Sequence, residues 1–388
     1  MPWKEHRAMS SRIEFVEKAS RPGANMSALC REYDISRQTG HKWLKRFKEH
    51  GYEGLEEESR RPSSTPLATG EEIVAALLAA RAAYPRWGPK KLVVVLRRTL
   101  GELTPSERTI HRVLQRFSKT RLRRKKRGLS VVERAPELTA AACNDIWTID
   151  FKGWWRAVDG TRCEPLTIRD AHSRFVLTVK LLERTTGDRV RLVMERLFRR
   201  HGVPRAIQCD NGSPFICSQS AAGLTKLSAW WVSLGIVVVR SRPASPQDNG
   251  AHERMHADIA GDLQIDPAAT FALQQRACDR WTKVFNHVRP HEALEGATPA
   301  ERYISSPTHK LTARIFGYPP TWIRRAVCAN GSIRLEGEDY FVTTALNGYQ
   351  VALQPTVGLR HRVWFHDVDL GEIEVADELS CRVKQTAK

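Results

Sequence analysis

The sequence predicts a multidomain protein in which two α-helical units precede an α/β domain and a small all-β domain follows. Three observations predict this class. The chain has 388 residues, more than one ordinary domain. Its apolar period changes from helical to alternating near residue 146, and short alternating segments return after residue 331. The expected boundaries are 1–55 for the first helical unit, 56–69 for a linker, 70–120 for the second helical unit, 121–140 for a basic linker, 141–305 for the α/β domain and 325–378 for the all-β domain.

The first unit is expected to hold three helices within residues 11–51. Ser27 and Ser36 can cap the second and third helices, and Gly51 can end the third. This is a helix-turn-helix layout, whose last helix can enter a DNA major groove. The alternative is a small helical bundle with a solvated basic face. The polar outer positions of the last helix, and so the candidate DNA contacts, are Arg37, Gln38, Thr39, His41, Lys42 and Lys45.

A second helix-turn-helix unit, winged-helix-like, is expected over residues 70–120. Its first two helices are separated by the breaker at 84–89, and Ser106 can cap the third, with Phe117 on its inner face. The outer basic positions of that helix are Arg108, Arg112 and Arg116. The basic run after it can lie along phosphates or be a solvated linker. Its candidate contacts are Arg123, Arg124, Lys125, Lys126 and Arg127.

The α/β domain is expected to contain a mixed five-stranded sheet flanked by helices. The predicted strands cover 146–152, 165–169, 175–182, 206–209 and 236–239, with helices after the third, fourth and fifth. A meander followed by strands that alternate with helices is the ribonuclease H-like order. Beyond it, turns at Asn347-Gly348 and at 369–371 between short strands predict a small β-barrel.

The charge distribution favours a polyanionic partner, double-stranded DNA. The net charge is +19, and residues 1–128 hold 29 basic against 14 acidic side chains, while the remainder holds 33 against 29. The positive charge is therefore concentrated in the helical units. A soluble protein with a basic surface is the alternative.

Several classes are disfavoured by the sequence. No apolar run is long enough to cross a membrane, and the charged first residues do not resemble a secretory signal. The eight cysteines include no Cys-x-x-Cys pair, so reduced thiols are expected rather than a zinc finger or a disulfide framework. We therefore expect a cytoplasmic protein with no membrane partner.

Three carboxylates are expected to converge in the α/β domain. Asp150 lies in the first strand, Asp210 ends the fourth and Glu253 begins the helix after the fifth. The first and fourth strands are neighbours in this order, so the two aspartates can face each other below that helix. Clustered carboxylates repel unless cations neutralise them, which predicts Mg²⁺ or Mn²⁺. Two ions in such a site can support phosphodiester cleavage.

A competing motif overlaps the third carboxylate. His252-Glu253-Arg254-Met255-His256 fits His-Glu-x-x-His, the signature of zinc peptidases. That chemistry needs a further zinc ligand and a largely buried helix, whereas this helix looks solvated in sequence. The two histidines are therefore interpreted as polar residues beside the site or in contact with DNA, and the peptidase stays a remote alternative.

These motifs resemble those of insertion-sequence transposases with a retroviral-integrase-like catalytic core. The resemblance covers most of the chain and rests on the segments around Asp150, 210–215 and 247–253, with the front helix-turn-helix and Tyr84-Pro85-x-Trp87-Gly88. Fifty-nine residues separate the first two acids and 42 the last two. The zinc domain that fronts the retroviral relatives has no counterpart here.

The resemblance implies a function. The catalytic and metal-binding acids of the family fall on Asp150, Asp210 and Glu253, which would hold two ions. Water would cut a DNA strand at the element end, and the freed 3′-hydroxyl would join target DNA. The helix-turn-helix units would bind the terminal inverted repeats, and pairing of two ends implies a homo-oligomer on the DNA. The protein would be bacterial and associated with the nucleoid when bound to DNA. The alternative from another class is a non-catalytic DNA-binding regulator derived from such an element.

Overall fold

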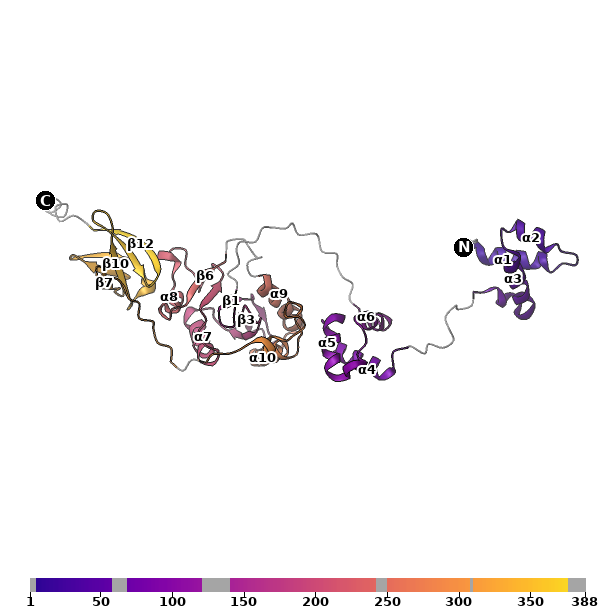
Figure 1. Cartoon of the computed structure of the whole chain (residues 1–388), viewed down its shortest axis with the longest axis horizontal. Coiled ribbons are helices and arrows are strands. Elements are labelled where there is room, and N and C mark those ends of the chain that lie inside the picture. The colour runs from indigo at the N-terminus through magenta and orange to yellow at the C-terminus, as the bar shows by residue number, and fades with distance from the viewer. Residues whose placement is uncertain (1–4, 58–67, 121–139, 242–249, 308–309, 376–388) are drawn as a thin grey trace. The chain divides into compact units, whose positions relative to one another are not determined.

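The computed structural model describes residues 5–57, 68–120, 140–241, 250–307 and 310–375. The chain divides into two compact units, Met1–Ala68 and Thr69–Lys388, and each is described by itself. Figure 1 shows their elements. The basic run at 121–127 and the loop before residue 250 lie outside the described residues.

The first unit is a small helical domain. Its elements are α1 (Glu5–Ala19), α2 (Met26–Glu32), α3 (Arg37–His50) and the 3-10 turn η1 (Gly51–Leu55). The core is formed by Phe15, Val16, Cys30, Ile35, Trp43 and Leu55. Two of the expected helix ends are confirmed: Ser36 Oγ accepts from Thr39 N at 3.1 Å, and Gly51, with φ of 62°, ends α3.

The expected cap of α2 is wrong. Asn25, not Ser27, is the N-cap, and its Oδ1 accepts from the backbone N–H of Ser27 and Ala28 at 3.1 and 3.2 Å. The helix begins one residue before Ser27, so the serine falls inside the first turn. Asn and Ser are almost equally good caps, and residue type alone does not choose between adjacent positions.

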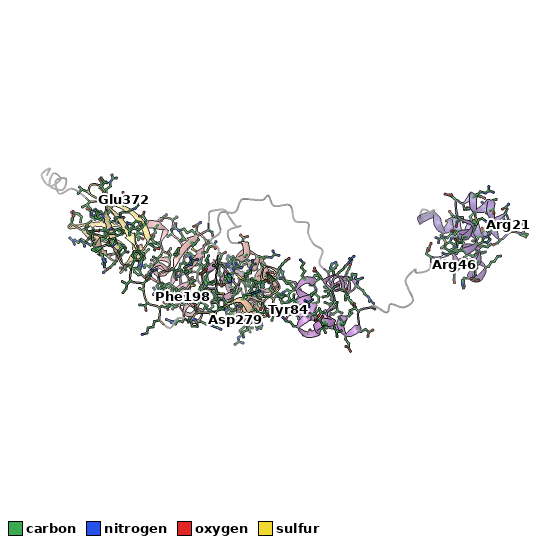
Figure 2. The ribbon with its side chains drawn as sticks, in the orientation of Figure 1. Arg21, Arg46, Tyr84, Phe198, Asp279 and Glu372 are labelled. Atoms are coloured by element: carbon green, nitrogen blue, oxygen red, sulfur yellow. The ribbon has the colours of Figure 1, made fainter. Side chains whose placement is uncertain are left out.

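The second unit opens with another three-helix group. It contains α4 (Glu71–Ala83), α5 (Pro89–Leu100), the 3-10 turn η2 (Gly101–Leu103) and α6 (Glu107–Arg116). Tyr84, which is labelled in Figure 2, lies in the breaker. Its ring stacks on that of Trp87, with centroids 4.0 Å apart. Ser106 caps α6 as expected. The expected burial of Phe117 is wrong: it is 41% exposed, because α6 ends one residue earlier and no longer directs it inward.

A mixed sheet forms the centre of the α/β domain. Its strands are β1 (Ile146–Phe151), β2 (Trp155–Arg156), β3 (Arg162–Asp170), β4 (Val176–Leu182), β5 (Ala206–Cys209) and β6 (Val237–Arg240). The order is β2-β3-β1-β5-β6, with β4 paired to β3. The first strands pair antiparallel, whereas β1, β5 and β6 run parallel. The mixed sheet is confirmed, but it has six strands and not five, because the two-residue β2 pairs with β3.

Helices cover both faces of this sheet. They are α7 (Gly187–His201), the 3-10 turn η3 (Ala221–Gly223), α8 (Lys226–Ser233), α9 (Gly250–Ile259), the π-helical turn η5 (Ala260–Gln264), α10 (Phe271–His287), η6 (Glu292–Leu294) and α11 (Pro299–Arg302). One core cluster joins Trp147 and Ile149 to α7 and α8, and another joins Val176 and Val179 to α9 and α10.

This division decides which face of the sheet can be polar. Trp147 and Ile149 of β1 point to the α7 and α8 side, and Leu166 and Ile168 of β3 do the same. Successive side chains of a strand point to opposite faces. Thr148 and Asp150 therefore belong to the face that α9 covers.

The last described region is all β. It contains β7 (Ile323–Ala326), β8 (Ser332–Leu335), β9 (Glu338–Phe341), the 3-10 turn η7 (Thr344–Leu346), β10 (Gln350–Pro355), β11 (Arg360–Phe365) and β12 (Val368–Glu374). A four-stranded sheet, β12-β11-β10-β7, and the β8-β9 hairpin share one core cluster. Closure into a barrel stays a prediction. The expected turn at 369–371 is wrong, since His366, with φ of 52°, begins the turn and Gly371 lies within β12.

Two expectations about the chain as a whole are also tested within the described residues. Cys30, Cys143, Cys163, Cys209, Cys217, Cys278 and Cys328 are all free thiols. None of the helices described has both the length and the apolar character needed to cross a membrane.

Candidate active site

Asp150 and Asp210 come from neighbouring parallel strands. Thr148 of β1 stands opposite Gln208 of β5, and each aspartate lies two residues further along its own strand. The side chain of Asp150 is 23% exposed and that of Asp210, just beyond β5, is exposed. Gly212 N–H donates to Asp210 Oδ1 at 3.2 Å, and a Cβ on Gly212 would stand only 3.0 Å from Asp210 Oδ2. The expected adjacency of these two strands is confirmed.

The electrostatics connect the third acid to the other two. The pKa of Asp150 is raised to about 7, first by burial and then by the charges of Asp210 and Glu253. Glu253 is exposed in the first turn of α9. The charges of Asp210 and Glu253 thus oppose the ionisation of Asp150, and a bound cation would offset this effect. Carboxylate oxygens are the ligands that Mg²⁺ and Mn²⁺ prefer. Among the described residues, however, the group whose ligand atoms lie close together is Asp150 with His252 and His256, so the convergence of all three carboxylates stays a prediction.

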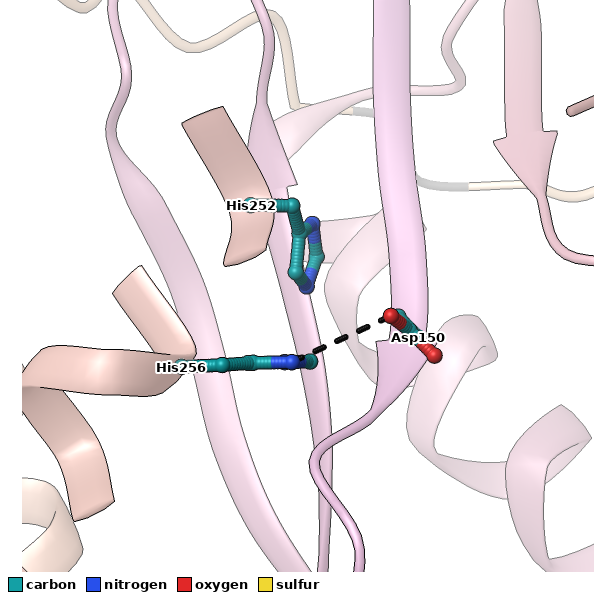
Figure 3. A group of neighbouring side chains, drawn as sticks. All are labelled: Asp150, His252 and His256. Carbon is teal, nitrogen blue, oxygen red and sulfur yellow. Dashed lines mark ion pairs between the residues drawn. The ribbon is translucent and has the colours of Figure 1, made fainter. Parts of the chain in front are cut away.

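Helix α9 is anchored on the sheet by His252, which is completely buried. Its Nδ1 lies 2.8 Å from Thr148 Oγ1 and its Nε2 lies 2.6 Å from Thr167 Oγ1. His256, one turn later, places its Nε2 2.8 Å from the same Thr167 hydroxyl. Figure 3 shows both rings extending from α9 toward the strand of Asp150. The expectation that this helix is solvated is wrong for this face, because Met255 and Ile259 are buried with His252.

The direction of these hydrogen bonds follows from the groups at the two ends. Arg169 Nε lies 3.2 Å from Thr148 Oγ1 and can only donate, so that hydroxyl accepts and turns its own proton to His252 Nδ1. At the other end, Thr167 Oγ1 donates to the backbone oxygen of Asp150 at 2.9 Å. The same Oγ1 must then accept from Nε2–H of both histidines.

This assignment leaves His256 Nδ1 without a proton, facing Asp150 Oδ2 at 3.9 Å (Figure 3). Both histidines are neutral. Burial lowers the pKa of His256 to about 3, helped by Lys152 and Arg169, and burial lowers that of His252 well below its usual value. A nitrogen lone pair and a carboxylate oxygen therefore face each other, an arrangement that favours a shared proton or a cation.

The competing zinc motif can be judged from the same contacts. Asp150, His252 and His256 each offer a ligand atom, and these atoms lie within 4.8 Å of one another. However, both ring nitrogens of His252 already bond to threonine hydroxyls, and both Nε2 atoms converge on Thr167. Zinc binding by this pair would require breaking those bonds. The contacts support the interpretation of the histidines as polar residues beside the site.

Comparison with protein families shows what this domain is similar to. Two models described as an integrase core domain match residues 140–246 and 234–299. A helix-turn-helix domain model matches residues 11–63, and a homeodomain-like domain model matches residues 39–114. Over 194 residues the chain is 25% identical to the insertion element IS407 uncharacterized 31.7 kDa protein of Burkholderia multivorans, covering 50% of this chain and 66% of that protein.

The resemblance to insertion-sequence transposases with an integrase-like core is confirmed. Among solved structures, the chain is similar to the HTLV-2 integrase catalytic core domain in complex with magnesium, with a TM-score of 0.32 and 17% identity, covering 43% of this chain and 100% of that one. It is also similar to the simian T-cell lymphotropic virus intasome in complex with PP2A regulatory subunit B56 gamma, with a TM-score of 0.37 and 16% identity over 76% and 98% of the two chains.

The candidate DNA contacts of the helix-turn-helix domains are mostly exposed. On α3, Arg37, Gln38, His41, Lys42 and Lys45 are exposed, whereas Thr39 is half-buried with its hydroxyl 2.8 Å from Ser36 Oγ. On α6, Arg108, Arg112 and Arg116 are exposed. The exposed positions are thus free of the helical cores. Their contact with DNA stays a prediction.

The integrase core also contains site residues that sequence reasoning missed. Thr148, Thr167 and Arg169 orient the helix that carries Glu253, yet none belongs to a recognisable motif. Their alternation with Trp147, Leu166 and Ile168 is a signal of polar positions on a strand that looks buried on both faces. A polar position in such a strand needs a partner, which is how these residues could have been found.

Proposed function

We propose that the protein is a DNA transposase that cuts DNA strands at the ends of its element and joins them to target DNA. The observation that carries the proposal is the acidic edge, formed by Asp150, Asp210 and Glu253 within an integrase core domain. Two of these acids extend from neighbouring parallel strands, and the third is on a helix anchored to the same sheet. Helix-turn-helix domains in the same chain support DNA as the substrate.

The reaction has two steps that balance without a covalent enzyme intermediate. In the first, the oxygen of water forms a bond to a phosphorus of the element end and the P–O3′ bond breaks, which leaves a 3′-hydroxyl and a 5′-phosphate. In the second, that 3′-oxygen attacks a phosphorus of target DNA, losing its proton to solvent. The 3′-oxygen of the target strand leaves and takes up a proton.

Each residue of the acidic edge has a role in this proposal. Asp150 and Asp210 would hold two divalent ions, and Glu253 would complete the ligands of one. When bound, Mg²⁺ or Mn²⁺ would supply the positive charge that stabilises the attacking and leaving oxygens. His252 is a positioning residue, since its bonds to Thr148 and Thr167 fix the rotation of α9 and thereby the direction of Glu253.

The remaining regions would bind DNA or partner subunits. The exposed side chains of α3 and α6 would contact the terminal inverted repeats, with the basic run at 123–127 along the phosphates. The C-terminal β region would form a barrel that holds DNA or another subunit. Arg360 and Arg362 are candidates for that contact, and they form ion pairs with Glu374 and Asp369 at 3.8 and 2.7 Å. Pairing of two element ends would require a homo-oligomer.

The test uses the full chain and labelled duplexes of its own element ends, incubated in Mg²⁺, Mn²⁺, Zn²⁺ or EDTA. We expect cleavage that leaves a 3′-hydroxyl and then joining to a second duplex, both absent in EDTA and in Glu253→Gln. Asp188→Asn is the matched control, because Asp188 is an exposed acid in the first turn of α7. Tight binding of the end duplex without cleavage under every metal would instead favour the DNA-binding regulator.

A further inference from the structure

A second charged feature, the basic pocket, lies against helix α9. It is a cavity of about 440 Å³ between α9, the end of β3, the segment after α10 and helix α5. Its basic lining consists of Lys91, Arg169, Arg174, Arg254 and Arg289. Two acids, Asp258 and Glu292, line it as well. The five cations thus exceed the anions by three, and they come from four separate segments.

The basic pocket is built from buried groups and not only from surface side chains. Arg169 is 6% exposed and Arg289 is 7% exposed. Arg289 pairs with Asp258, yet its Nε has no hydrogen-bond partner within the described residues. The same holds, across the described chain, for the buried Nε2 of His291, which also lines the cavity. Buried polar atoms without a hydrogen-bond partner are rare, and the Nε–H of Arg289 is a donor that calls for an acceptor.

The lysine of the basic pocket reflects the crowding of positive charge. Burial lowers the pKa of Lys91 to about 8, and the charges of Arg289 and Arg254 act in the same direction, opposed by Asp258 and Asp262. Arg174, half-buried at the end of the β3–β4 turn, has a lowered pKa because of burial and of Arg254. An anion placed among these groups would relieve both the repulsion and the missing hydrogen bonds.

One residue belongs to both the basic pocket and the active site. Arg169 uses Nε to bond Thr148, the first member of the hydrogen-bond chain that runs through His252 and Thr167 to Asp150. Arg169 also lines the cavity. Arg254 is the neighbour of Glu253 in sequence. An anion in the basic pocket would therefore lie against α9, which carries Glu253, and against β3, which pairs with the strand of Asp150.

We propose that the basic pocket binds a backbone phosphate of DNA while another phosphodiester of the same DNA lies at the acidic edge. This inference takes DNA as the ligand from the proposed function. Guanidinium groups suit phosphate because they donate several hydrogen bonds from a planar fork. A free phosphate ion shares this chemistry, so the experiment includes it as a separate arm.

The test measures binding of a random-sequence duplex to the full chain in EDTA over a series of salt concentrations. We compare Arg254→Gln and Lys91→Gln with Arg196→Gln, an exposed arginine on α7 outside the cavity. The two pocket variants are expected to weaken binding about 3- to 10-fold and to reduce the slope of log K against log salt by about 1, the loss of one phosphate contact. The control should change neither quantity.

A second measurement separates binding from folding. Lys91→Gln removes a buried positive charge, so its melting temperature should equal or exceed that of the wild type, whereas a purely structural role would lower it. Variants that match Arg196→Gln in affinity and in salt slope would overturn the proposal. The proposal would also be overturned if calorimetry showed that Arg254→Gln abolishes binding of inorganic phosphate but leaves the affinity for duplex unchanged.

The outcome is independent of catalysis, because no divalent ion is present. If the pocket variants lose affinity and slope but the wild type cleaves no end duplex in Mg²⁺ or Mn²⁺, the proposed function fails and the basic pocket stands. If cleavage occurs and the pocket variants bind duplex like the control, the proposed function stands and the proposal for the basic pocket fails.

Discussion

The acidic edge and the basic pocket share helix α9, but they concentrate opposite charges, the first beside β1 and β5 and the second at the end of β3. At the acidic edge, Asp150 carries a raised pKa because it is buried beside two other carboxylates. At the basic pocket, Lys91 carries a lowered pKa because it is buried beside arginines. A ligand of the opposite sign would stabilise the charged form of Asp150 in the first cluster and of Lys91 in the second. A divalent cation and a DNA phosphate are the two such ligands that the proposed reaction brings together.

Between the two clusters lies a neutral layer. His252 and His256 are uncharged and bond to threonine hydroxyls, so they separate the carboxylates from Arg169 without adding charge to either side. Opposite charges therefore need not be paired with each other to coexist in one small domain. A layer of satisfied neutral groups keeps both available for ligands.

The largest expected effect is the loss of catalysis when the acidic edge is broken. Asp210→Asn keeps the shape of the side chain but removes a charge that the proposed ions require. We expect strand cleavage to fall by more than about 100-fold, because metal stabilisation of this kind is worth several kcal/mol. Rates on labelled end duplexes measure this. A cleavage rate of Asp210→Asn within tenfold of that of Asp188→Asn would contradict the assignment of Asp210. The affinity of Asp210→Asn for duplex in EDTA should equal that of the wild type.

The next effect is a gain in stability for the metal-free protein. The pKa of Asp150 rises from 3.8 to about 7 on folding, so the folded state binds the proton more tightly and this group destabilises the fold as pH rises from about 4 to above 7. Asp150→Asn should therefore raise the unfolding free energy in EDTA at pH 8 by at most about 4 kcal/mol, and the melting temperature with it. At pH 4 the substitution should change both quantities little.

Melting curves at the two pH values provide the measurement, and Mg²⁺ should raise the melting temperature of the wild type at pH 8 but not that of the variant. An equal effect of Asp150→Asn at both pH values would show that the carboxylate is not strained by its neighbours.

A smaller effect is expected from the neutral layer. Thr167→Val preserves shape but removes the oxygen that accepts two Nε2–H groups and donates to the Asp150 backbone. Leaving buried donors unsatisfied should cost about 1–3 kcal/mol of unfolding free energy. Urea unfolding at neutral pH measures it, with Thr178→Val on the half-buried Thr178 of β4 as the control. Equal costs for the two variants would refute the hydrogen-bond chain.

The smallest effect concerns the rim of the basic pocket. Glu292 pairs with Lys90 at 3.2 Å, but the two side chains are 86% and 67% exposed. Glu292→Gln should change stability by less than about 1 kcal/mol, as exposed ion pairs do. Removing this negative charge should raise duplex affinity slightly, within about twofold at low salt. A larger loss of stability would mean that this pair, and not the pocket, organises the segment.

Much of this arrangement could be predicted from sequence because it depends on local patterns. The order of strands, the adjacency of the strands of Asp150 and Asp210, and the caps at Ser36 and Ser106 all follow from short-range signals. Errors arose where neighbouring residues compete for one position. Asn25 took the cap expected of Ser27, and β12 continued through Asp369 and Gly371 because the turn had already occurred at His366.

The polar interior of the site could not be predicted in the same way. His252 looked solvated because its neighbours in sequence are charged, yet its partners Thr148 and Thr167 are 104 and 85 residues away. The basic pocket likewise joins Lys91 to Arg254 across domains of the sequence that show no common pattern. Tertiary contacts of this range decide burial, and no local period encodes them.

The distance of 104 residues between Thr148 and His252 also has a consequence for the time course of folding. Contacts between distant residues close long loops and form late. Helix α9 should therefore dock after the meander and β5 have paired, and the docking should be slowed by His252→Ala. A chain arrested before that step would hold two aspartates side by side with no third acid, so the DNA cleavage that we propose would be the last property that the folding core acquires.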